Sequence, residues 1–189
     1  MTFEMDVAQP PALRIDADDF ALFRLAPRFA LDAGELDVRW KAMQRQVHPD
    51  RFAAEGAAAQ RVAMQWALRV NEAYQRLRLP LTRAAYLCEL HGQPIRADDN
   101  TAMSPAFLVR QMAWREALDT AHTVDAVAML ASEVSALEKH IHHELGVLLD
   151  ERRDWLGAVE QVRELMFISR LAEVIHQRSD ALDQVLSMP

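Results

Sequence analysis

The 189-residue sequence predicts an all-α protein. Its strong helix formers are abundant, with 31 Ala and 23 Leu, whereas the residues that favour strands are few, with 5 Ile, 14 Val and 5 Thr. Several long segments place apolar residues three and four positions apart, the spacing that gives a helix one buried face. The chain has 5 Gly and neither a GxGxxG nor a GxxxxGK[ST] motif. These observations argue against both a β-rich fold and an α/β nucleotide-binding fold.

The first half of the chain predicts a short helix followed by a helical hairpin. Asp18 and Asp19 suit a helix N-terminus, and Pro27 closes the short helix that follows them. A second helix is expected over residues 35–47, where Pro49 ends it. A loop of sequence DRFAAEG follows, and then a third helix over residues 57–77. Because their connection is short, we expect the second and third helices to pack as an antiparallel pair.

The second half of the chain predicts a short helix and a three-helix bundle. The short helix runs from Thr82, its expected cap, to Leu90, and the loop QPIRADDNTAMSP separates it from the bundle. Ser104 begins the first bundle helix, which runs to about residue 121. The other two helices are expected over 123–153 and 155–186. The expected domains are therefore 16–80, a linker helix and loop over 81–103, and the bundle over 104–189.

Charge and cysteine content limit the class of protein. The formal net charge is −7, with 13 Lys+Arg against 14 Asp+Glu in residues 1–103 and 8 against 14 in residues 104–189. This balance argues against a nucleic-acid binder. The single cysteine, Cys88, allows neither an intramolecular disulfide nor a CxxC metal site, and we expect it to be a small buried residue. No secretory signal and no membrane span is evident, so a cytoplasmic location is expected.

A basic line precedes a polar tripeptide at the tip of the expected hairpin. Lys41, Arg45 and His48 are spaced four and three positions apart, so they share one helix face. Pro49 and Asp50 complete the sequence His-Pro-Asp. Two further arginines flank this line, namely Arg39 and Arg51. An exposed Asp on a rigid turn can accept charge-assisted hydrogen bonds from a partner, and a basic face steers an acidic partner.

The tripeptide and its surroundings resemble a J-domain, the module by which DnaJ-type co-chaperones engage DnaK-class chaperones. DDFALF precedes the HPD turn in VHPDRF, and NEAYQRLRLPLTRAAYL follows it. The whole pattern, from about Asp18 to Leu186, resembles the HscB type of J-protein. That resemblance implies an L-shaped protein whose J-domain stimulates the ATPase of an HscA-type chaperone. Its bundle would hold an IscU-like iron–sulfur scaffold, so the chain itself needs no catalytic residue and no cofactor.

The resemblance also implies a scaffold-binding patch in the bundle. Leu108 and Met112 are four positions apart and lie off the line of apolar residues that suits the bundle core. Phe167 points about 200° around its helix from the core position Leu165. The matching family positions here are Leu108, Val109, Met112 and Phe167, with Glu116 as an acidic neighbour. Two other positions that can be acidic in the family are Ala113 and Thr120 in this chain.

Three alternatives stay open at this point. The apolar patch can instead cover the linker helix or the J-domain, and the bundle can bind a client other than a scaffold. His140, His142 and His143 suggest a metal site, but their spacing also fits a solvated helix face, and we expect no metal there. The chain lacks the N-terminal cysteine-pair motif with which some eukaryotic relatives bind zinc.

Overall fold

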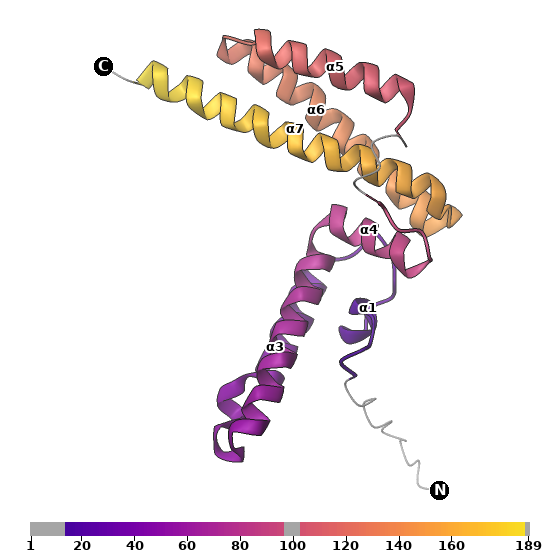
Figure 1. The fold of residues 1–189 in the computed structure, drawn as a ribbon, viewed down its shortest axis with the longest axis vertical. Coiled ribbons are helices and arrows are strands. Elements are labelled where there is room, and N and C mark those ends of the chain that lie inside the picture. Colours follow the sequence, from indigo (N-terminus) through magenta and orange to yellow (C-terminus); the bar gives the residue numbers. More distant parts are fainter. Residues whose placement is uncertain (1–13, 97–102, 188–189) are drawn as a thin grey trace, which may run out of the picture. The chain divides into compact units, whose positions relative to one another are not determined.

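The computed structural model describes residues 14–96 and 103–187, with side chains through residue 184. Helices form all of its regular secondary structure, and no strand occurs within these ranges (Figure 1). The all-α prediction is confirmed. The chain divides into two compact units, one of Met1–Pro27 with Asp32–Arg78 and the other of Arg28–Leu31 with Leu79–Pro189.

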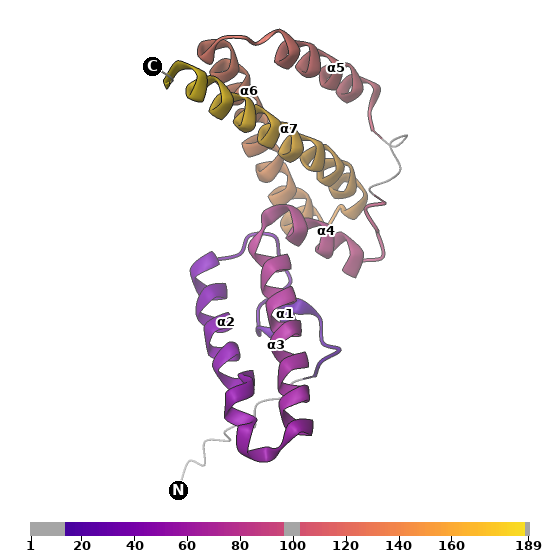
Figure 2. The same ribbon diagram turned by 60° about the vertical axis from the view of Figure 1, so that its left-hand side comes forward.

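The first unit is a helical hairpin with a short helix packed on it. Helix α1 spans Asp19–Leu22, α2 Ala33–Val47 and α3 Ala57–Arg78. Figure 2 shows α2 and α3 side by side, as the short connection predicts. Helix α2 begins two residues earlier than expected, because the Asp32 carboxylate accepts hydrogen bonds from the N–H groups of Gly34 and Glu35.

The connection between α2 and α3 is more regular than the expected loop. Residues Pro49–Glu55 wind into the 3₁₀ helix η1, which packs against α3. Pro49 suits the first position of this helix because its missing N–H would have no partner there. Gly56, with φ of 93°, then turns the chain into α3. Only glycine adopts this conformation without strain, so η1 ends there.

The hairpin core combines apolar packing with a few directed hydrogen bonds. Leu36 of α2 and Val70 of α3 are completely buried. The Trp40 ring stacks on Tyr74 with centroids 4.4 Å apart, and its Nε1 donates to the Asn71 side chain. The Tyr74 hydroxyl donates to Asp37 at 2.7 Å. These bonds fix the register of α2 against α3, which apolar contacts alone leave adjustable.

A buried carboxylate joins α1 to α3. Asp19 is fully buried, and its two oxygens lie 2.7 Å from the guanidinium of Arg69 and 3.0 Å from that of Arg76. Arg69 also donates to the backbone carbonyls of Ile15 and Ala17. Since α1 has only four residues, it is far too short to be stable alone. These ion pairs therefore hold it on the hairpin together with its buried side chains Phe20 and Leu22.

The described residues of the second unit form four α-helices. They are α4 (Pro80–Leu90), α5 (Pro105–Thr120), α6 (Val124–Gly146) and α7 (Trp155–Ser187). Ser104 caps α5, as predicted, and Thr123 caps α6. The prediction of Thr82 as the cap of α4 is wrong. Leu79 occupies that position and Pro80 follows as the first helical residue, where a proline lacks no hydrogen bond.

Helix α4, expected as part of a linker, packs against α7 within the second unit. Its residues Ala84, Leu87 and Cys88 are buried, with at most 1% of their surface exposed. The expected linker loop includes residues 97–102, which lie outside the described part of the chain. Helix α4 thus contributes to the hydrophobic core of the second unit.

The main core of the second unit lies between α6 and α7. Val134, Ile141 and Leu145 of α6 are buried, as are Leu165 and Ile168 of α7. The end of α6 widens into a π-helical turn, Val147–Arg152, before Arg153 adopts a left-handed conformation with φ of 55°. This change reverses the chain and sends α7 back along α6 (Figure 2).

The π-helical turn also binds the short segment Arg28–Leu31. The Asp150 carboxylate accepts hydrogen bonds from the backbone N–H of Phe29 at 2.6 Å and of Ala30 at 2.8 Å. The Phe29 ring is buried, and the Arg83 guanidinium lies 5.3 Å from its centroid. Burial lowers the pKa of Arg83, and the nearby Asp150 charge opposes that change.

We predict that Asp19→Asn destabilises the first unit. The amide cannot neutralise both arginines, so the free energy of unfolding should fall by about 3 kcal/mol, the lower part of the range for a broken buried pair. Hydrogen exchange followed by mass spectrometry should show faster exchange in α1 and α3. Asp16→Asn is the matched control, because the Arg14–Asp16 pair is exposed. Equal exchange in the two variants would contradict a stabilising role for Asp19.

Candidate partner-binding sites

The HPD turn presents an exposed carboxylate on a fixed backbone. His48 has extended backbone angles, which end α2, and its Nδ1 accepts a hydrogen bond from the Asp50 N–H at 3.3 Å. Pro49 restricts the backbone between them. The Asp50 side chain is 89% exposed and that of His48 55% exposed. The turn therefore holds its backbone rigidly while leaving both side chains accessible to a partner.

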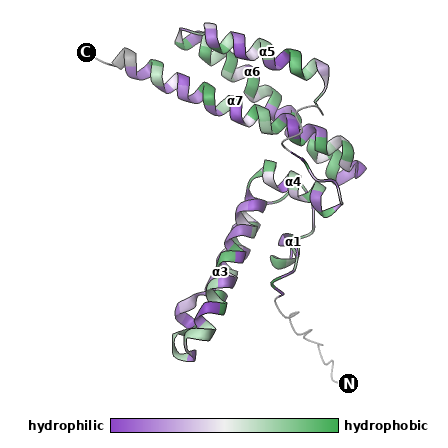
Figure 3. Ribbon diagram, viewed as in Figure 1, coloured by the Kyte–Doolittle hydropathy of each residue, from purple (hydrophilic) through white to green (hydrophobic). Residues whose placement is uncertain are grey.

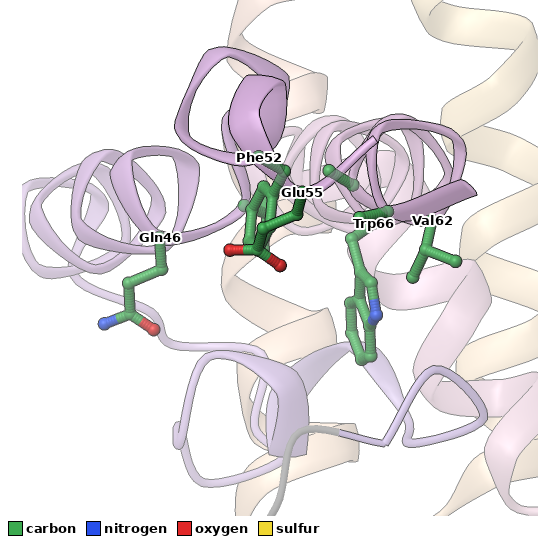
Figure 4. A pocket seen from close by; sticks show the side chains of 8 residues that line it. Gln46, Phe52, Glu55, Val62 and Trp66 are labelled. Atoms are coloured by element: carbon green, nitrogen blue, oxygen red, sulfur yellow. The ribbon is translucent and has the colours of Figure 1, made fainter. Parts of the chain in front are cut away.

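An apolar pocket lies beside this turn, within the first unit. Its volume is about 420 Å³, and Phe52 and Glu55 of η1 line it together with Val62 and Trp66 of α3. Figure 4 shows these side chains and Gln46 of α2 extending to the same side of the hairpin. Phe52 and Trp66 are half-buried, so they provide the apolar contacts by which η1 packs on α3. Apolar contacts with α3 thus hold in place the 3₁₀ helix that begins within the HPD turn.

One of the basic residues expected around the turn is directed away from the exposed face. Lys41 and Arg45 are exposed on the outer face of α2. Arg39 is instead directed to the connector between α1 and α2, where it donates to the carbonyls of Phe23 and Arg24 and pairs with Glu35. Arg51 donates to the Arg45 carbonyl at 3.1 Å, across the turn.

Sequence reasoning missed one member of the outer face of α2. Val38 is 67% exposed, and it lies three positions before Lys41 and seven before Arg45. This spacing places it on the same face as the two cations. A search for apolar residues within the basic line would have found it. The face accordingly offers an apolar contact one turn before its two positive charges.

Helix α5 has an apolar outer surface. Leu108, Val109 and Met112 are 41%, 68% and 71% exposed, and Glu116 lies one turn further along and is also exposed. The opposite side of the helix is buried through Phe107 and Trp114. A helix that is apolar on two sides usually packs against something on each side. One side of α5 packs against the core of this unit, and the other is exposed. The other side is therefore a candidate interaction surface.

Phe167 lies beneath α5 and is only half-buried. Its ring meets Phe107 edge-on at 5.7 Å and stacks on Trp114 at 6.2 Å, measured between centroids. The Trp114 Nε1 donates to Glu133 at 2.9 Å, which joins α5 to α6. Phe167 is thus an aromatic support for α5, which accounts for its place off the core stripe of α7. Near it, burial raises the pKa of Glu164, and the Arg110 charge partly offsets this.

The histidines of α6 do not form a metal site with their neighbours. His140 and His143 are exposed and His142 is half-buried. Within residues 14–96 and 103–187, no three His, Cys, Asp or Glu side chains gather closely enough to hold a metal ion. Within the same ranges, none of the helices combines the length and the apolar character needed to cross a membrane.

Comparisons with known proteins agree with this geometry. Residues 103–176 match the family described as the HSCB C-terminal oligomerisation domain. The chain is 50% identical over 157 residues to a co-chaperone protein HscB homolog of Bordetella petrii, covering 82% of this chain and 92% of the relative. A Burkholderia mallei HscB homolog is also 50% identical, over 87% of this chain and 95% of the relative.

Solved structures show the same likeness. Chaperone HscB from Vibrio cholerae matches with a TM-score of 0.78 and 34% identity, over 88% of this chain and 99% of the other. Human co-chaperone protein HscB matches with a TM-score of 0.82 and 29% identity, over 90% and 84%. These relatives are co-chaperones, a class of proteins that act on other proteins and are not themselves enzymes, and the helical hairpin and bundle of this chain agree with that class. The chain belongs to the HscB family of co-chaperones.

We predict that Cys88 does not react with thiol reagents while the protein is folded. It is completely buried, and its Sγ lies 3.9 Å from the Trp155 carbonyl oxygen. Burial, with a smaller effect of the Glu89 charge, raises its pKa to about 11. Roughly a thousandth of the thiol is then ionised at pH 8, and only the thiolate reacts.

Labelling with a chromogenic disulfide should therefore be negligible at pH 8 and should become fast in urea. The chain has no other cysteine, so the signal reports this position alone. Rapid labelling of the folded protein would show that α4 opens readily.

Proposed function

We propose that this protein delivers an IscU-like iron–sulfur scaffold to an HscA-type chaperone and stimulates the chaperone's ATPase. The single observation that carries the proposal is the exposed HPD turn, held by the hairpin of the first unit in a chain that belongs to the HscB family. A bundle with a second exposed surface, on α5, supports the scaffold half of the proposal. The cytoplasmic location and the absence of a cofactor stay predictions from the sequence.

The chaperone-binding surface comprises the HPD turn and the charges near it, namely His48, Pro49, Asp50, Arg39, Lys41, Arg45 and Arg51. Asp50 is suited to accept a charge-assisted hydrogen bond from a chaperone arginine, because it is almost fully exposed on a turn with a fixed backbone. Lys41 and Arg45 would attract an acidic surface and raise the association rate. Arg39 would act indirectly, since its guanidinium holds the connector before α2.

The scaffold-binding surface comprises Leu108, Val109, Met112, Glu116 and Phe167. The first three offer exposed apolar area, and Glu116 adds a charge that can select a partner with a basic residue nearby. Phe167 would contribute chiefly by packing against Phe107 and Trp114, which supports α5 from within the bundle.

Carrying two binding sites on one chain explains how such a protein works without catalysis. A scaffold bound to the second unit is tethered to the chaperone engaged by the first unit. Its effective concentration at the chaperone then rises, which favours transfer without any new contact between the two partners.

The HPD turn is tested by Asp50→Asn. The amide keeps the shape but loses the charge, so stimulation of the ATPase of an HscA-type chaperone should fall at least tenfold, while the circular dichroism spectrum stays unchanged. Glu173→Gln removes an exposed carboxylate of α7 and is the matched control. His48→Gln should behave like Asp50→Asn. Full stimulation by both HPD variants would refute the proposed chaperone site.

The scaffold site is tested by Leu108→Ser. Losing one apolar contact should weaken scaffold binding about tenfold, equivalent to about 1.4 kcal/mol, in isothermal titration calorimetry. Val174→Ser, an exposed apolar position on α7, should leave the affinity unchanged. Basal stimulation of the chaperone should be preserved in both variants. If the wild-type protein stimulates the chaperone but shows no affinity for the scaffold, the bundle serves a different client.

A further inference from the structure

An open groove runs between α5 and α6 at the end of the second unit. Its volume is about 730 Å³. Ala117 and Thr120 line it from α5, and Met129, Glu133 and Ala136 line it from α6. Most of these side chains are small, so the groove follows from the short side chains where the two helices meet. It lies outside the surface proposed above for the scaffold.

The groove exposes one large apolar side chain, Met129, and packing within the protein does not explain that exposure. Its side chain is 75% exposed, the highest value among the large apolar side chains in the described part of the chain. Exposed methionines are common at binding surfaces, because their flexible and polarizable side chains adapt to a partner. The neighbouring Leu130 also lines the groove but is buried, so Met129 is the exposed one of the two apolar side chains that α6 places there.

The groove is continuous with the outer surface of α5. Val109, Ala113, Glu116 and Thr120 are spaced four, three and four positions apart, so they form one line along the helix. All four are exposed. Because Thr120 also lines the groove, a partner that contacts Val109 and Glu116 can continue along α5 into the groove. The side chain of Ala113 on this line is too small to obstruct such a partner.

Three carboxylates lie in or beside the groove, and one cation, Arg178, lies near its end, 3.4 Å from His122. Glu116 lies one turn before Thr120 on α5, and Asp125 lies one turn before Met129 on α6, each on the same face as the residue it precedes. The Glu133 carboxylate, which binds Trp114, is part of the groove wall. Residues 104–189 as a whole carry 8 Lys+Arg and 14 Asp+Glu. An occupant with basic residues beside its apolar contact therefore fits this site best.

We propose that the scaffold protein inserts an apolar side chain, flanked by Lys or Arg, into this groove against Met129. The inference rests on the proposed function, because it takes the scaffold as the partner of α5. It extends the binding surface from α5 onto α6, which then takes part in the recognition. The contact with Met129 supplies apolar burial, while Glu116 and Asp125 select for the basic flank.

The test compares Met129→Lys with Met129→Glu in the full-length protein. Both changes remove the apolar contact, so each should weaken scaffold binding at least fivefold in titration calorimetry. The lysine variant should be weaker still, because it repels the basic flank. Leu156→Glu, an exposed apolar position on α7, is the matched control and should bind normally. Circular dichroism and thermal melting establish that all three variants remain folded.

The outcomes separate this inference from the proposed function. If both Met129 variants bind the scaffold normally while Leu108→Ser binds it more weakly, the proposed role of the groove is wrong and the proposed site on α5 is retained. Absence of scaffold binding by the wild-type protein overturns both. If sedimentation shows that the wild-type protein self-associates and the Met129 variants do not, while scaffold affinity is unchanged, the groove is an interface between two copies and the proposal is wrong. If Met129→Glu binds the scaffold more weakly than Met129→Lys, the inserted side chain is not flanked by Lys or Arg, and that part of the proposal is wrong.

Discussion

The buried Asp19 carboxylate is the interaction on which the first unit depends. Helix α1 has only four residues and lacks the length to be stable alone, so its position comes from contacts with α3. Asp19 meets Arg69 and Arg76, and Arg69 also binds the chain before α1. A paired carboxylate in an apolar setting tolerates few other arrangements, because any displacement would leave a buried charge without a partner. This specificity keeps the hairpin in one geometry and so gives the HPD turn a stable support.

Charge has two separate uses in this protein. Arg39, Arg69 and Arg76 are directed inward, to backbone carbonyls or to carboxylates, and they hold segments of the first unit together. Lys41 and Arg45 are exposed beside Val38 and face outward. Net charge does not distinguish these groups, because it counts an arginine paired within the protein and an exposed lysine alike. The surface available to an acidic partner is therefore smaller than the number of cations suggests, and it includes an apolar residue, Val38, at one end.

Helix α5 shows how one element serves both the core and a partner. Its inner side is fixed by the rings of Phe107 and Trp114 against Phe167, and by the hydrogen bond from Trp114 to Glu133. Because these contacts are aromatic and directional, they hold α5 with few residues. The outer side can then expose Leu108, Val109 and Met112 without loss of the helix. An apolar surface supported in this way is ready for a partner before binding, which lowers the entropic cost of association.

The sequence by itself determined the helices, the helical hairpin and the HPD turn at its tip, because helix periodicity, caps and prolines act over a few residues. The family was indicated separately, by the resemblance of the HPD turn and its flanking sequence to HscB-type J-proteins. Ser104 and Pro49 acted as expected, whereas the starts of α2 and α4, the 3₁₀ helix that begins at Pro49 and the π-helical turn after α6 differed. Tertiary structure decided which side chains pack or hydrogen-bond within the protein and which stay available to a partner. Arg39 was drawn to the carbonyls of Phe23 and Arg24, and Phe167 to the rings of α5, through contacts between segments distant in sequence. Periodicity indicates which face of a helix a residue occupies, but the partner on that face is set by how separate helices pack.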